Sequence, residues 1–283
     1  HADLVELEDG RWYMVALGIR NDEERRSNMG RETHLIPVEW EREPYWWKEK
    51  KYLWPVAAPT TGRVERETPL PFSGKNQKVR LAFNDNFTSP ELGVEWTFRR
   101  MPAVNAYSLT ARPGHLRLFT QQTVPTARER VAQLGIKQTE TAFQFTARTE
   151  FAASRSETEA GISIFQKDNH YLNATVEQSN DQYILKVTLA NRGEPEILVS
   201  QALPGYSGAL EWRIDSEAGI YSISYRLHAD SEWSLLHKVP SKLLLSQYYT
   251  GAHIGFYTSS NGADTKDFMD IDWINYQGRS SAE

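Results

Sequence analysis

Short stretches typical of β-strands follow one another along almost the whole chain, and helix signals are nearly absent. After the first 78 residues they recur at intervals of about 8–15 residues, as runs rich in Val, Ile, Phe, Tyr, Trp and Thr between Gly, Pro, Asn and Asp clusters. In one such run Tyr221, Ile223 and Tyr225 fall on one side, and Ser222 and Ser224 on the other, as in a strand with one buried face. Roughly a dozen strands at this spacing predict an all-β sandwich of the jelly-roll type. They include Leu116–Phe119, Ala142–Phe151 and Glu196–Ala202.

The sequence divides into two predicted domains joined by a linker. Residues 1–65 contain a few extended segments separated by long polar stretches, which is too little to close a core alone. Residues 66–78 are rich in Pro, Gly and polar residues without a period, and we interpret them as a linker. Residues 79–283 then form the predicted sandwich. The one predicted helix is Ala127–Leu134, because Thr126 and Glu129 have the spacing of a capping box.

Composition limits the kinds of partner. The chain has 32 Lys and Arg against 37 Asp and Glu, for a net charge of -5, so we expect no nucleic-acid partner. No run approaches the ~18 apolar residues of a transmembrane helix, so we expect no membrane partner either. The absence of cysteine removes disulfides and thiolate chemistry and leaves both a secreted and a cytoplasmic location open.

Aromatic residues make up 12% of the chain, and six of them lie close together in residues 40–54. The group is dense enough to cover a sugar ring, but sheet cores use aromatic side chains in the same way, and core packing is the commoner use. It consists of Trp40, Tyr45, Trp46, Trp47, Tyr52 and Trp54.

Common catalytic motifs are missing. The sequence has no G-x-S-x-G elbow and no glycine-rich phosphate loop. A pair of catalytic carboxylates cannot be recognised by spacing, because such acids come from distant strands. His1 is explained equally by a chain end, and Arg31, which opens a predicted strand, by a surface salt bridge. Because a strand-like segment starts at His1, we expect the chain to be a piece of a longer protein.

Several motifs carry a family resemblance. The stretches HADLVE, GRWYMVALG, N-x-GRETHLIPVEW and WPVAAPTTGRVE resemble the last part of the five-bladed β-propeller of glycoside hydrolase family 43, in its β-xylosidase and α-L-arabinofuranosidase branch. The stretches FNDNFTSPELGVEWTFRRMP, EAGISIFQKDNHY, YTGAHIGFYTSSNG and DIDWINY are similar to the concanavalin A-like sandwich that follows it. The resemblance implies a terminal propeller blade in residues 1–65 and a concanavalin A-like sandwich in residues 79–283.

The resemblance also implies roles. His1 would lie at the central cavity of the propeller, where some members hold a metal ion, and Arg31 would reach the sugar and the catalytic carboxylates. The family hydrolyses glycosides with inversion, using an acid and a base that belong to earlier blades, so no catalytic residue is expected in this chain. The substrate of the whole enzyme would be a xylo-oligosaccharide or an arabinoside, and the sequence leaves xylose against arabinose open.

Further candidates lie in the sandwich. Tyr249, or its neighbour Tyr248, is the aromatic residue that would reach into the mouth of the propeller; an ordinary loop residue is the alternative. Asp85 and Asp272, near the first and last strands, would hold a structural Ca²⁺, or are simply turn acids. No other cofactor is expected, and a homo-oligomer remains open. The alternative function is a carbohydrate-binding or interaction sandwich without catalysis.

Overall fold

The computed structural model describes the chain except for residues 45–50, 66–67, 73–81, 181, 246–248 and 280–283. The chain forms two compact units. The first, here called the blade unit, contains His1–Asn21 and Gly30–Lys78, and the second, the sandwich unit, contains Asp22–Met29 and Val79–Glu283. Most of the predicted linker, residues 66–78, lies outside the described residues. The short segment Asp22–Met29 is part of the sandwich unit, although its neighbours on both sides belong to the blade unit.

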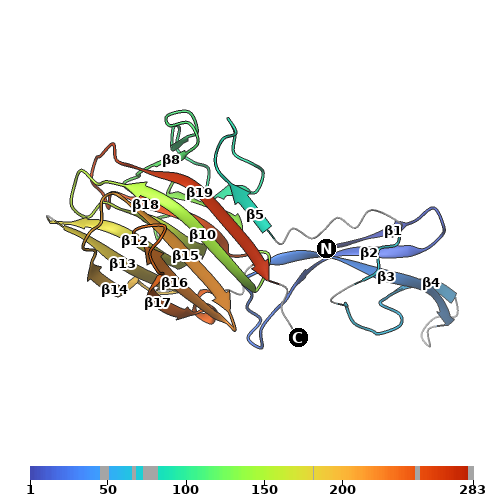
Figure 1. The fold of residues 1–283 in the computed structure, drawn as a ribbon. Helices are drawn as coiled ribbons and strands as arrows, with labels where there is room; N and C mark the ends of the chain where they lie inside the picture. Colours follow the sequence, from blue (N-terminus) through green and yellow to red (C-terminus); the bar gives the residue numbers. More distant parts are fainter. Residues whose placement is uncertain (45–50, 66–67, 73–81, 181, 246–248, 280–283) are drawn as a thin grey trace. The chain divides into compact units, whose positions relative to one another are not determined.

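The blade unit is a four-stranded antiparallel sheet (Figure 1). Its strands are β1 (Ala2–Glu6), β2 (Trp12–Ile19), β3 (Arg31–Pro44) and β4 (Lys51–Ala57), and they pair in the order β1-β2-β3-β4. The turn between β1 and β2 contains Gly10 at a φ of 80°, a conformation that glycine adopts without strain. Four strands in simple up-and-down order are the unit of a propeller blade. The sheet has the number and order of strands that the predicted terminal blade requires.

Exposed apolar side chains mark this blade. Val5, Leu17, Leu53 and Trp54 are all exposed among the described residues. Of the predicted aromatic group, Trp40 packs edge-on against Trp12, with ring centroids 5.2 Å apart. Tyr45, Trp46 and Trp47 lie outside the described residues.

The sandwich unit consists of two antiparallel sheets. One sheet contains eight strands: β5 (Ala82–Asp85), β7 (Tyr107–Ser108), β8 (Leu116–Phe119), β10 (Ala142–Phe151), β15 (Ala209–Glu217), β16 (Ile220–Arg226), β17 (Ser234–Pro240) and β19 (Phe268–Arg279). They pair in the order β17-β16-β15-β10-β19-β8-β7, and β5 pairs with β19 (Figure 1).

The second sheet has seven strands. They are β6 (Trp96–Phe98), β9 (Ala132–Lys137), β11 (Glu159–Lys167), β12 (His170–Ser179), β13 (Gln182–Asn191), β14 (Glu196–Ala202) and β18 (His253–Ser259). Their order is β14-β13-β12-β11-β18-β9-β6. This two-sheet architecture confirms the predicted concanavalin A-like sandwich.

The core lies between the two sheets. Along β10, buried Phe143 and Phe145 alternate with less buried Gln144 and Thr146, as expected for a strand with one face on a core. The ring of Phe145 packs against Phe256 of the other sheet, with centroids 6.2 Å apart. The core is thus built from the inward side chains of both sheets.

The predicted helix Ala127–Leu134 is wrong. Its last three residues, 132–134, belong to β9, which pairs with β18 and β6 and is buried on both faces. A short apolar run of this kind cannot be assigned to helix or strand by periodicity alone. Gly135 does not end a helix: it lies opposite Gly255, and a Cβ on it would come within 2.8 Å of the carbonyl oxygen of Ile254.

Helical structure is minor in the described part of the chain. It contains the 3-10 turn η1 (Ser241–Leu244), and no helix there has the length and hydrophobicity needed to cross a membrane. The predicted alternation in β16 is correct: Tyr221 and Ile223 lie in the core, and Ser224 lies opposite Arg213, outside it. Ser224 is nevertheless buried, so its face is not open to solvent at this position.

One buried histidine makes stability depend on pH. His170, at the start of β12, is 1% exposed, and its Nδ1 lies 2.9 Å from the side-chain oxygen of Asn169. Burial, together with the charges of Lys167 and Arg192, lowers the pKa of His170 from 6.5 to about 4. The unfolded chain therefore takes up a proton near pH 6.5 that the folded chain refuses until about pH 4, and we expect a loss on the order of 3 kcal/mol of unfolding free energy over this interval.

Urea unfolding at pH 7.5 and pH 4 measures this loss. His170→Gln should unfold with a smaller difference between the two pH values, because the group that titrates is gone. His228→Gln, at an exposed position, should keep the full difference. Equal pH dependence in His170→Gln and the parent would show that other groups cause it.

Candidate functional site

His1 and Arg31 lie at the same end of the blade sheet. The carbonyl oxygen of His1 accepts a hydrogen bond of 3.1 Å from the backbone N–H of Leu17. Arg31 begins β3 opposite Ile19, two positions further along β2. Both side chains are exposed. The sheet therefore brings together two of the candidate residues, although their roles stay predictions.

The acid next to Arg31 has its own partner. Glu32 accepts two hydrogen bonds from the guanidinium of Arg20, at 2.7 and 2.8 Å. Gly18, opposite Glu32, leaves space for the ring of His34, because a Cβ on Gly18 would lie 2.4 Å from its Nε2. This end of the sheet is thus a packed polar surface.

The segment that precedes Arg31 is fixed to the sandwich unit, of which it is a part. The carbonyl oxygen of Ser27 accepts a hydrogen bond of 2.9 Å from Nε2 of Gln166, and that of Asn28 accepts one of 2.6 Å from the N–H of Ala252. Met29 is buried. We call Asp22–Met29 the anchor loop.

The anchor loop also joins a buried chain of hydrogen bonds. Nδ2 of Asn28 donates to the hydroxyl of Tyr221 at 3.2 Å, and that hydroxyl donates to Oε1 of Gln138 at 2.9 Å. Burial raises the pKa of Tyr221 to about 12, so the hydroxyl stays protonated and can donate at neutral pH. The loop is thereby connected to the interior of the sandwich.

The predicted Tyr249 comes two residues before Gly251, which contacts the anchor loop. The side chain of Tyr249 is 60% exposed. Two residues later, Gly251 packs so closely on Met29 that a Cβ on Gly251 would lie 2.5 Å from the Met29 carbonyl oxygen. Met29 in turn precedes Arg31 by two residues. Tyr248, the alternative candidate, lies outside the described residues.

The predicted calcium ligands lie on opposite faces of one sheet. Asp85 pairs with the buried Ile274, and its carboxylate accepts hydrogen bonds of 2.8 Å from both the N–H of Phe87 and Nε1 of Trp96. Trp96 belongs to the core. The Asp85 side chain therefore points toward the interior of the sandwich.

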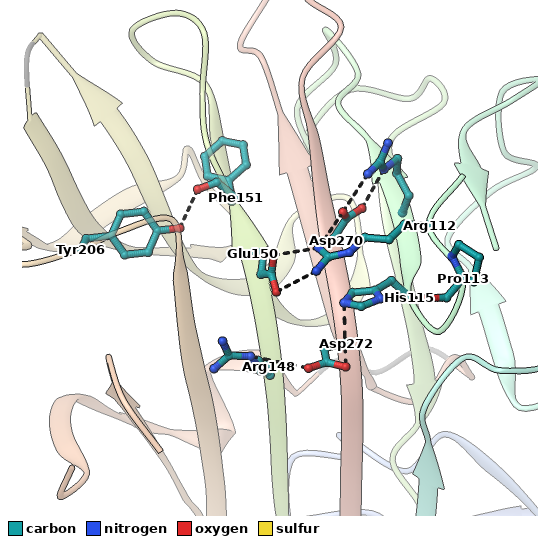
Figure 2. Close-up of polar contacts among 10 residues, drawn as sticks. Arg112, Pro113, His115, Arg148, Glu150, Phe151, Tyr206, Asp270 and Asp272 are labelled. Carbon is teal, nitrogen blue, oxygen red and sulfur yellow. Dashed lines mark hydrogen bonds and ion pairs between the residues drawn. The ribbon is translucent and has the colours of Figure 1, made fainter. Parts of the chain in front are cut away.

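Asp272 faces outward and lies beside an arginine and a histidine (Figure 2). Its carboxylate oxygens lie 3.6 Å from Nε of Arg148 and 3.9 Å from Nε2 of His115. The neighbouring Asp270 accepts hydrogen bonds of 2.7 and 2.8 Å from Arg117. Burial acts to raise the pKa of Asp270, and its arginine partners outweigh that effect and hold the pKa below its usual value.

These surroundings do not fit a calcium ion shared by Asp85 and Asp272. Each oxygen of the first carboxylate already accepts a hydrogen bond from an N–H donor, and the second carboxylate lies beside a guanidinium that would repel a dication. Among the described residues, no three acidic or histidine side chains come together as metal ligands. We therefore derive no role for Ca²⁺ at this pair.

Comparison with known proteins identifies the family. The sequence profile described as "Beta xylosidase C-terminal Concanavalin A-like domain" matches residues 84–277, most of the sandwich unit. The chain belongs to this β-xylosidase C-terminal domain family. The family resemblance predicted from the sequence motifs is thereby confirmed.

Relatives of the family extend the match to the blade. The chain is 29% identical over 288 residues to a "Xylosidase/arabinosidase" of Butyrivibrio fibrisolvens. It is 26% identical over 280 residues to "Non-reducing end alpha-L-arabinofuranosidase BoGH43B" of Bacteroides ovatus. The solved structure of the Bacteroides ovatus GH43B protein superposes with a TM-score of 0.85, over 99% of this chain and 53% of that one.

The matches cover nearly all of this chain but only about half of each curated relative. The two curated proteins are matched over 98% of this chain but only 50% and 52% of their own lengths. The chain thus spans about half the length of the curated relatives it matches. It corresponds to their C-terminal half.

The anchor loop is a part of the site that was not predicted from the sequence. Asn28 and Gly30 belong to the N-x-GRETHLIPVEW motif, and Gly251 belongs to the YTGAHIG motif. From these two motifs only Arg31 and Tyr249 were predicted as site residues. A contact between two segments so far apart in the sequence leaves no periodic signal in either of them.

Proposed function

We propose that this chain is the C-terminal portion of a family 43 glycoside hydrolase that releases xylose or arabinose from the ends of xylo-oligosaccharides or arabinosides. The names of the relatives in Butyrivibrio fibrisolvens and Bacteroides ovatus support this substrate class. In this proposal the sandwich shapes the active-site pocket and the blade carries His1 and Arg31 to it.

One observation supports the shaping role above all. The anchor loop, which leads directly into Arg31, is hydrogen-bonded and packed within the sandwich unit at Ala252 and Gly251, next to Tyr249 in the sequence. The chain therefore leaves the sandwich unit at a position that these contacts fix, two residues before Arg31. An arginine that orients a substrate depends on such support, because a displacement of about 1 Å can cost on the order of 10²-fold in rate.

The proposed chemistry needs two carboxylic acids from outside this chain. Inverting hydrolysis uses one acid to protonate the leaving oxygen and one base to activate water on the other face of the sugar. In the proposal both belong to earlier blades. Arg31 then binds hydroxyl groups of the sugar or a catalytic carboxylate through its planar fork of N–H donors.

Gly251→Ala in the full-length enzyme tests the shaping role. We expect kcat/KM for aryl β-xylosides or α-L-arabinofuranosides to fall by about 10-fold or more, because the new methyl group displaces Met29 and the entry to β3. The chain alone should give no hydrolysis above background. Progress curves with both substrates measure these rates.

The matched control is Gly193→Ala, where an added Cβ meets no atom within 4 Å. It should leave the rate unchanged. Equal rates in the Gly251 variant and the parent would show that the sandwich does not support the pocket. A full-length protein without any hydrolysis would favour the non-catalytic alternative, and hydrolysis by the chain alone would place the catalytic acids within it.

A further inference from the structure

An open groove lies on the outer face of the eight-stranded sheet, apart from the anchor loop. It has a volume of about 490 Å³. Its lining comes from the end of β5 and the middle of β10 and β19: Asn84, Asp85, Asn86, Thr146, Trp273, Ile274 and Asn275. All of these residues belong to the sandwich unit.

A β-bulge turns a tryptophan toward this groove. In the β10–β19 pairing, Arg148 lies opposite Trp273 and Thr149 opposite Ile271, so Asp272 is an extra residue. Ile271 and Ile274 both point into the core. The two residues between them, Asp272 and Trp273, therefore stand outside the core together, and bulges commonly re-aim a side chain in this way beside binding sites.

The Trp273 ring is unusual among the tryptophans of this unit. It is partly exposed, and among the described residues it has no aromatic or cation–π partner. Trp233, in contrast, has the guanidinium groups of Arg213 and Arg226 over its ring, at 4.8 and 4.6 Å. Trp273 thus offers an open aromatic surface at the groove.

Uncharged polar groups form a row beside the ring. The register places Asn84 opposite Asn275, and Asn275 opposite Thr146, on three adjacent strands. Asn84 and Asn275 are exposed, and no side-chain hydrogen bond is made by any of the three within the described part of the chain. Their amide and hydroxyl groups can both donate and accept toward a ligand.

The charges around the groove are already paired. Arg148 lies 3.6 Å from Asp272 (Figure 2), and Arg213 lies 2.8 Å from Asp215. Asp85 is held by N–H donors, as described above. The groove therefore presents an aromatic face and neutral polar groups, which suits an uncharged polyhydroxylated ligand better than an anion or a cation.

We propose that this groove binds a neutral sugar ring of a xylan-type oligosaccharide, with the ring on Trp273 and its hydroxyl groups on Asn84, Asn275 and Thr146. The choice of a xylan-type sugar rests on the proposed function. The groove itself is derived from the structure alone. Such a site would hold the polymer on the sandwich at a distance in sequence from Arg31 and Tyr249.

Titration of the 283-residue chain with xylohexaose tests the proposal, with binding measured by tryptophan fluorescence and by calorimetry. We expect saturable binding that Trp273→Ala weakens at least tenfold and Asn275→Ala by about threefold to tenfold. Trp233→Ala, on the same sheet face, is the matched control and should bind like the parent. Arg31→Ala reports whether the sugar binds in the proposed active-site pocket instead. Polygalacturonate should not compete, because the groove has no unpaired cation.

Several results would overturn the proposal. They are the absence of saturable binding at millimolar xylohexaose, an unchanged affinity in folded Trp273→Ala, and a loss of binding in Arg31→Ala, which would assign the sugar to the pocket of the proposed enzyme. Failure of the full-length protein to hydrolyse xylosides, with Trp273-dependent binding intact, would remove the proposed function and keep this site. Circular dichroism of each variant shows that it is folded.

Discussion

Replacing Arg31 with alanine in the full-length enzyme is expected to lower kcat/KM by on the order of 10²-fold or more. The guanidinium lies at the end of the blade sheet where His1 also lies, and the anchor loop fixes the backbone just before it. Loss of a charged group that positions substrate commonly has an effect of this size. Steady-state kinetics on aryl xylosides and arabinofuranosides measure it.

Arg31→Lys distinguishes shape from charge. A lysine keeps the positive charge but cannot form two parallel hydrogen bonds, so we expect nearly the same loss as with alanine. Arg63→Lys, at an exposed turn, is the control and should leave the rate unchanged. Arg31 variants that fold and react within threefold of the parent would show that this residue does not contact the substrate.

Alternation of side chains was enough to predict most of the sandwich. The strands Leu116–Phe119, Ala142–Phe151 and Glu196–Ala202 were predicted with the bounds that the structure shows. Prediction failed at β9, which is buried on both faces and so lacks alternation. It also missed β7, which is only two residues long.

The faces on which Asp85 and Asp272 lie could not be predicted from the sequence. The two acids lie on neighbouring strands, since β5 pairs with β19. A strand has a period of two, however, and Asp85 lies opposite the inward-pointing Ile274, while the bulge turns Asp272 outward. A shift of one residue changes the face on which a side chain lies, and a bulge cannot be located from one sequence.

The second large effect is expected at Lys186, which lies between two acids on the seven-stranded sheet. Its Nζ lies 2.6 Å from Glu159 and also pairs with Glu177, and all three side chains are largely buried. Burial acts to lower the pKa of Lys186, but the two carboxylates outweigh it and raise the pKa. Lys186→Met should therefore lower the unfolding free energy by about 3–5 kcal/mol, as removal of one partner of a buried ion pair does.

The cost comes from the acids that remain, because Glu159 and Glu177 lie directly opposite each other on β11 and β12. Like charges in that position repel, and without the lysine Glu159 keeps hydrogen bonds from the hydroxyl groups of Thr175 and Tyr257, which do not neutralise its charge. We therefore expect Lys186→Met combined with Glu159→Gln and Glu177→Gln to recover most of the loss in urea unfolding at pH 7. Lys238→Met, at an exposed position on β17, should change little. If the triple variant is as unstable as Lys186→Met, burial and repulsion of the two unpaired acids are not the cause of the loss.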